Sequence, residues 1–169
     1  MVELNRCTCG YLHVGPAPEF CPVCGAPASV FVKVDSLPDL AGSKTLENLK
    51  AAFAGESQAN RKYTLWRRIA ELEGAPASAL AAFDRAANEE TAHALGHLAY
   101  MGGFGTTAEN LKAASEGEGY ECTEMYPDFA AIAEAEGFDV IAGYFRKVGG
   151  FEKGHREEYL AALAELEQS

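Results

Sequence analysis

The chain has 169 residues and a formal net charge of −11 at pH 7; 48% of its residues are hydrophobic and 23% are charged. This length and composition predict a globular protein with one sizeable domain, or one domain and a small module. The negative charge disfavours binding to nucleic acid or to an anionic membrane surface. Because no apolar run approaches roughly 18 residues and the start has no signal-peptide core, we expect no membrane span, a cytoplasmic protein, and cysteines that are thiols or metal ligands.

The first 34 residues differ from the rest because they are rich in glycine and proline and contain four of the five cysteines: Cys7, Cys9, Cys21 and Cys24. So small a segment needs a crosslink to hold a core. Four thiolates on two tight turns favour tetrahedral iron or zinc. The first cysteine pair has one intervening residue instead of two, so the alternative is that the metal has been lost and the segment only caps the bundle. Residues 35–43 are expected to be a linker, with Pro38 and Gly42 as breakers.

Four longer stretches have the apolar periodicity of amphipathic helices. The expected helices cover residues 45–73, 77–101, 108–136 and 138–167. Ser43 or Thr45 is expected to cap the first helix. Pro127 should kink or interrupt the third, because proline lacks the N–H that bonds one turn back. The predicted fold is therefore mainly α, with residues 44–169 forming a four-helix bundle.

Each predicted helix places acidic or imidazole side chains on its apolar face, where residues three and four apart lie together. The second and fourth helices each have a Glu-x-x-His pair, and the first and third add carboxylates alone. The full set is Glu56, Glu90, His93, Glu118, Glu121, Glu152 and His155. Burying an unpaired carboxylate costs several kcal/mol, and five of them would unfold an ordinary domain, so cations must neutralise them. This ligand pattern is typical of di-iron and di-manganese bundle proteins.

Simpler interpretations apply to some of these residues. A single Glu-x-x-His pair is more often a solvent-facing helix pair than a metal site, but two pairs on apolar faces with three further carboxylates favour metal. We expect His97, one turn after His93, to be a hydrogen-bonded core histidine. Cys122 is expected to be a small, partly buried residue.

Two resemblances extend this interpretation over nearly the whole chain. CGYLHVG and CPVCGAP resemble rubredoxin, whose first motif has Cys-x-x-Cys where this chain has Cys7-Thr8-Cys9. FAGESQANRKY, NEETAHA, EGEGYECTEMYPDFA and FEKGHREEY resemble the four metal-bearing helices of rubrerythrin. With the four-cysteine module first, the order is similar to that of the reverse-rubrerythrin subgroup. The resemblance implies a ferritin-like bundle with two non-haem iron ions, preceded by a rubredoxin-like module with one iron on four cysteines, where zinc is the alternative metal.

The resemblance to rubrerythrin also implies a role for each side chain. It implies terminal ligands at Glu56 and Glu118, bridging ligands at Glu90 and Glu152, and a ligand to one iron at His155. His93 and Glu121 would exchange at the other iron according to its oxidation state. Tyr63 and Tyr126 match family tyrosines near the site, where they would donate hydrogen bonds to ligand carboxylates or to peroxide.

The function implied by the resemblance is a peroxidase that reduces hydrogen peroxide to water in oxidative-stress defence. Electrons would come from a redox protein, such as an NAD(P)H-dependent reductase, through the rubredoxin-type iron. A homodimer is expected. The linker is long enough for the module to dock on its own bundle or on a partner's. The resemblance implies that one chain's thiolate-bound iron serves the other's di-iron site, and helix exchange between the chains is left open. The alternatives are a ferroxidase or iron-handling relative of ferritin, and a zinc-stapled structural or sensor protein with an inert bundle.

Overall fold

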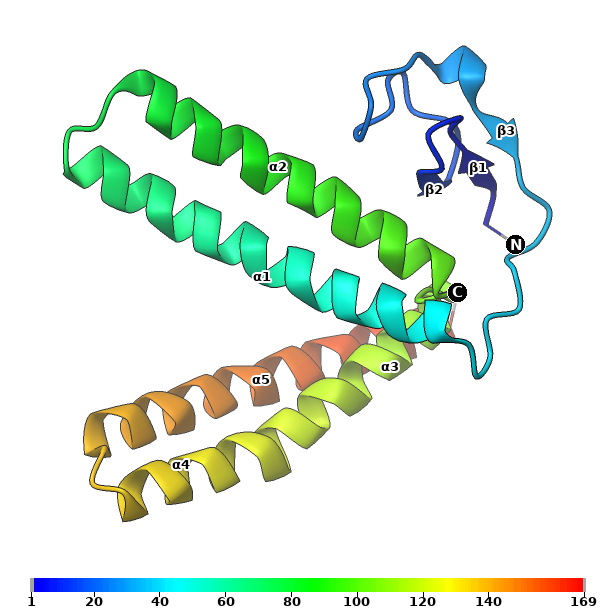
Figure 1. Ribbon diagram of the computed structural model, residues 1–169. Coiled ribbons are helices and arrows are strands. Elements are labelled where there is room, and N and C mark those ends of the chain that lie inside the picture. Colours follow the sequence, from blue (N-terminus) through cyan, green and yellow to red (C-terminus); the bar gives the residue numbers. More distant parts are fainter. Residues whose placement is uncertain (1, 169) are drawn as a thin grey trace. The chain divides into compact units, whose positions relative to one another are not determined.

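A computed structural model describes residues 2–168 and shows a small N-terminal sheet followed by long helices (Figure 1). The helical elements are α1 (Lys44–Leu72), α2 (Ala77–Tyr100), α3 (Thr107–Tyr120), the π-helical turn η2 (Glu121–Met125), α4 (Tyr126–Ala135) and α5 (Asp139–Leu166). The chain divides into two compact units, unit 1 (Met1–Phe104) and unit 2 (Gly105–Ser169). No helix in the described part of the chain is long and apolar enough to cross a membrane. The predicted mainly helical fold is confirmed.

The N-terminal module is a three-stranded antiparallel sheet with the order β2-β1-β3. Its elements are β1 (Leu4–Arg6), β2 (Leu12–Val14), the short 3₁₀ helix η1 (Ala28–Val30) and β3 (Val32–Lys33). Two tight turns carry the cysteines. Gly10 and Gly25 take positive φ angles of 97° and 72° there, a conformation that glycine adopts without steric cost.

Helices α1 and α2 form an antiparallel pair in unit 1 (Figure 1). Ser43 begins α1, because its hydroxyl accepts a hydrogen bond from the Leu46 N–H at 3.1 Å. The buried Asn60 crosslinks the pair, since its amide donates to the Ala87 carbonyl at 2.6 Å and to the Thr91 hydroxyl at 2.8 Å. The capping prediction for Ser43 is thus confirmed.

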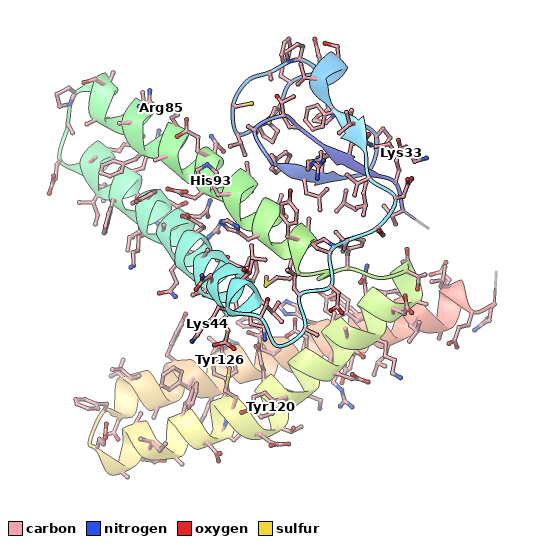
Figure 2. All side chains as sticks on the ribbon, turned by 45° about the vertical axis from the view of Figure 1, so that its right-hand side comes forward. Lys33, Lys44, Arg85, His93, Tyr120 and Tyr126 are labelled. Atoms are coloured by element: carbon pink, nitrogen blue, oxygen red, sulfur yellow. The ribbon has the colours of Figure 1, made fainter. Side chains whose placement is uncertain are left out.

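The module packs on the C-terminal half of α2 within unit 1, and both figures show the sheet beside that helix (Figure 2). Leu4 and Leu12 of the sheet share a buried cluster with Ala99 of α2. Val34, Leu37, Tyr100 and Phe104 pack around this cluster. The module is therefore held to α2 by apolar burial, a contact that the sequence periodicity did not predict.

In unit 2, α3, η2 and α4 form one interrupted helix that packs along α5. The interruption predicted at Pro127 is confirmed, and it takes the form of a π turn. The Tyr126 N–H bonds to the Glu121 carbonyl, five residues back, just before proline removes the next donor. Beyond the extra residue, Ile132 is 57% exposed while Ala133 is buried.

Candidate metal centres

The four cysteines of the module converge on one point. Their sulfurs all lie within 4.8 Å of one another, with Cys7 to Cys24 at 3.7 Å and Cys9 to Cys21 at 3.8 Å. A tetrahedral ion held about 2.3 Å from each sulfur separates the sulfurs by about 3.8 Å. The one-residue spacing of the first pair therefore still gives a set of thiols with tetrahedral-site dimensions.

The electrostatics of this cluster also fit a cation. The backbone N–H of Cys9 lowers the pKa of Cys7 to about 7, so that one thiolate forms readily. The Tyr11 N–H acts in the same direction on Cys9, but burial and the neighbouring thiols raise the pKa of Cys9 overall. Burial likewise raises the pKa of Cys21. Each further thiolate is disfavoured by those already present, and a bound cation removes that penalty.

Unit 1 brings together three of the predicted ligands, Glu56 from α1 and Glu90 and His93 from α2; one ligand atom from each lies within 4.8 Å of the others. We call this group the first triad. Nδ1 of His93 is 2.7 Å from a Glu90 carboxylate oxygen. Burial, and then the neighbouring Glu90, raise the pKa of Glu56. Figure 2 labels His93 on α2, the helix that carries the module.

Unit 2 brings together Glu118 from α3 with Glu152 and His155 from α5, again within 4.8 Å, and we call this group the second triad. Nδ1 of His155 is 2.8 Å from a Glu152 oxygen and 3.8 Å from a Glu118 oxygen. Burial raises the pKa of Glu118, and the charges of Glu152 and then Glu121 raise it further. Glu121 is thus close to the second triad without being one of its three members.

The two triads are built alike. Each has two carboxylates and one imidazole, and in each the histidine contacts the glutamate three residues before it. Such mixed oxygen and nitrogen ligands suit iron. Without a cation, the pKa values of Glu56 and Glu118 are raised, and a bound cation would lower them.

The two predicted tyrosines occupy matching aromatic clusters. The Tyr63 ring lies 5.5 Å from Trp66 and 6.5 Å from Phe83 in unit 1. The Tyr126 ring lies 6.2 Å from Phe145 in unit 2, and burial followed by the charge of Glu121 raises its pKa. The negative charges of the second triad therefore also act on the Tyr126 hydroxyl. Tyr63 has ring contacts, and no hydrogen bond to a first-triad residue is present in the described chain.

Residues beside the candidate ligands have distinct settings. His97, expected to be a hydrogen-bonded core histidine, is half-buried, and its positive charge, when protonated, lowers the pKa of Glu56. Cys122 is half-buried as expected, and its thiol lies 3.4 Å from the Gly119 carbonyl oxygen.

Comparison with known proteins decides the family. The family model described as rubrerythrin matches residues 47–163, and the one described as rubrerythrin, rubredoxin-like domain, matches residues 6–32. The chain belongs to the rubrerythrin family. It is 40% identical over 152 residues to a rubrerythrin of Porphyromonas gingivalis, covering 82% of this chain and 76% of the relative. It is 32% identical over 156 residues to reverse rubrerythrin-1 of Clostridium acetobutylicum, covering 83% of this chain and 85% of the relative.

Family membership confirms the ferritin-like helical domain, the rubredoxin-like module that precedes it, and the two kinds of iron site. Rubrerythrins are non-haem di-iron proteins involved in oxidative stress. The predicted division has a module at residues 1–34, a linker at 35–43 and one bundle at 44–169, and it stays a prediction. The two compact units are instead divided along the chain between residues 104 and 105.

Proposed function

We propose that the protein is a non-haem di-iron peroxidase that reduces hydrogen peroxide to water, with electrons relayed through the four-cysteine iron. One observation carries this proposal: two matched carboxylate–imidazole triads occur in the same chain as a tetrahedral set of four thiols. Bound iron would supply the two electrons that cleavage of the O–O bond requires, with two protons, to give two water molecules. A ferroxidase needs no built-in one-electron site, so the module favours the peroxidase.

In this proposal the residues of the two triads would hold the two iron ions. Glu56 and Glu118 would serve as terminal ligands, Glu90 and Glu152 would be shared by the ions, and His155 would bind one of them. A carboxylate bridge holds two ions at the spacing of a few Å that two-metal chemistry uses. The sequence likeness of the two helix pairs and the equal composition of the triads support this assignment.

Glu121 and His93 are proposed to share the remaining ligand position. A ferric ion is the harder acid and prefers the Glu121 carboxylate, whereas a ferrous ion accepts the neutral His93 imidazole more readily. The charge of Glu121 contributes to the raised pKa of Glu118, and this supports the assignment of Glu121 to the site. Exchange of one ligand for the other opens a position for peroxide.

Tyr126 is proposed to donate a hydrogen bond to a ligand carboxylate or to bound peroxide, and Tyr63 to do the same from unit 1. The raised pKa of Tyr126 favours the protonated hydroxyl, which is the form that donates a hydrogen bond. Tyr126 also lines an open cavity of about 590 Å³ in unit 2, together with Cys122 and Arg156. A small peroxide molecule can approach the tyrosine through this cavity.

The test begins with iron-loaded protein that has been fully reduced without oxygen. Rapid reoxidation by hydrogen peroxide, with repeated turnover when a donor is supplied, is expected. Slow reaction with peroxide combined with fast oxidation of iron by dioxygen would instead identify a ferroxidase. Metal analysis and an absorption spectrum of natively purified protein come first, since a zinc-only preparation would favour the structural or sensor alternative.

The electron donor is proposed to be a redox protein such as an NAD(P)H-dependent reductase. Two of the four cysteines, Cys9 and Cys24, are exposed, which leaves one edge of the sulfur cluster accessible to a donor protein. The compartment in which this exchange takes place is expected to be the cytoplasm.

A further inference from the structure

The module and the first triad border the same cavity in unit 1. This cavity has a volume of about 190 Å³, and Gly10, Tyr11 and Val23 line its module side. On the α2 side it is lined by His93, Gly96, His97 and Tyr100. Gly10 directly follows Cys9, one of the four thiol residues, and His93 is a member of the first triad. The residue that follows one of the four cysteines and a member of the first triad therefore line one cavity of the same chain.

Two contacts hold the walls of this cavity together. The Tyr100 hydroxyl of α2 donates a hydrogen bond to the Gly10 carbonyl at 2.6 Å. Gly96 is buried under the Tyr11 ring, and a Cβ atom added at Gly96 would lie only 3.1 Å from that ring. A larger side chain at Gly96 would push the ring, and with it the module, away from α2. Glycine is unfavourable in mid-helix relative to alanine, and here its missing side chain permits the close approach.

We propose that Gly96, Tyr11 and Tyr100 form a docking contact that fixes the four-cysteine module beside the first triad of its own chain, so that electrons reach this triad within one chain. This departs from the expectation that one chain's module serves a partner. As far as it concerns electron transfer, the inference rests on the proposed function. Electrons enter singly from the donor protein, and two such transfers match the two electrons that one hydrogen peroxide molecule takes up.

His97 lines the same cavity as Gly10 and Tyr11. It also lies one helical turn from both His93 and Tyr100. The buried apolar cluster of Leu12 and Ala99 adjoins this region, so the module is seated by packing as well as by one hydrogen bond.

The first experiment measures the contact itself. Labelled protein carrying a ferric ion in the four-cysteine site and zinc in the bundle is compared by NMR with all-zinc protein. The paramagnetic ion should broaden the amide signals of Gly96–Tyr100 and leave those near Ala77, at the other end of α2, sharp. Unlabelled chains carrying ferric ion are then mixed and equilibrated with labelled chains carrying zinc. Broadening of the labelled Gly96–Tyr100 signals in this mixture would overturn the proposal, because it would show a module acting across chains.

Gly96→Leu should abolish the broadening, whereas Gly143→Leu should not, since nothing lies near a Cβ at Gly143 of α5. If Gly96→Leu does not fold, Tyr100→Phe removes the hydrogen bond to Gly10 alone and should weaken the broadening. Unchanged broadening in a folded Gly96→Leu variant would refute the docking contact.

A kinetic comparison separates this inference from the proposed function. In Gly96→Leu, internal reduction of the iron pair by a prereduced module should slow several-fold, while reoxidation of chemically prereduced protein by peroxide should stay at the parent rate. Unchanged internal reduction would refute the route through the contact. If prereduced parent protein does not react with peroxide, the peroxidase proposal fails, and the NMR result still decides where the module docks.

Discussion

Asn60 shows how much a single buried polar side chain contributes to unit 1. Its amide nitrogen bonds to both Ala87 and Thr91 across the helix pair. Asn60→Ala should lower the free energy of unfolding by about 1–3 kcal/mol, because the Ala87 carbonyl loses a hydrogen bond and a small void forms. Urea titration measures the change. Asn88→Ala, at an exposed position of α2, is the control, and equal stability of the two variants would contradict the role of Asn60.

The proposed ligand exchange gives opposite predictions for two residues. Glu121→Ala should leave iron binding largely intact but slow oxidation by peroxide, because the diferric state loses a carboxylate. His93→Ala should instead slow re-reduction, because the diferrous state loses an imidazole. Stopped-flow absorbance at matched iron loading measures both half-reactions.

Glu124→Ala is the matched control for this exchange, since Glu124 is exposed on the same π turn as Glu121. It should oxidise and reduce at the parent rate. If the Glu121 and His93 variants also cycle at the parent rate, the exchange is refuted, and Glu121 acts only by tuning its neighbours.

At the scale of elements, the helix ends could be predicted because their signals are local. Ser43 caps α1, Gly74 takes a positive φ before α2, and Gly137 takes one before α5. The glutamate and histidine of each Glu-x-x-His pair could likewise be placed on one face of their helix from their spacing alone. The π turn and the seat of the module could not, because they depend on residues meeting in three dimensions. The sequence shows Gly96 only as a glycine within a predicted helix and does not indicate what packs against it.

Each helix pair contains a carboxyl group whose raised pKa affects the stability of the metal-free protein. The pKa values of Glu56 and Glu118 are raised by folding, so the folded state binds more protons than the unfolded state above their ordinary pKa of about 4.3. Metal-free protein should therefore gain stability as the pH falls toward this ordinary pKa, and lose it as the pH rises through the folded pKa values. Thermal unfolding across this range measures the slope.

The double variant Glu56→Gln/Glu118→Gln should flatten this pH slope, while Glu124→Gln/Glu158→Gln, at two exposed positions, should leave most of it. Metal-loaded protein should show a weaker slope, because the cation keeps the ligand carboxylates ionised. An equal effect of the two double variants would assign the slope to net charge rather than to the triads.

At the scale of the whole molecule, exposed apolar side chains favour association with a second copy. In unit 1, Leu65, Trp66, Ile69 and Leu72 are exposed, and in unit 2 Phe129, Ile132, Tyr144 and Phe151 are exposed. Exposed apolar surface of this extent is typical of interfaces. Sedimentation should show a homodimer at micromolar concentration. A monomer at this concentration would contradict the predicted homodimer.

The π turn at Glu121–Met125 contains one residue more than a regular helical turn, so we expect one residue there to be dispensable for folding. Each residue advances a helix by about 100°, so a deletion within a regular helix puts everything beyond it out of phase. The π turn already holds one residue too many, and deleting the exposed Thr123 should restore an ordinary helix with both ends still in phase. That variant should melt close to the parent yet bind iron more weakly, whereas deleting Ala113 from α3 should unfold unit 2. The spare residue would then be kept for the metal and not for the fold.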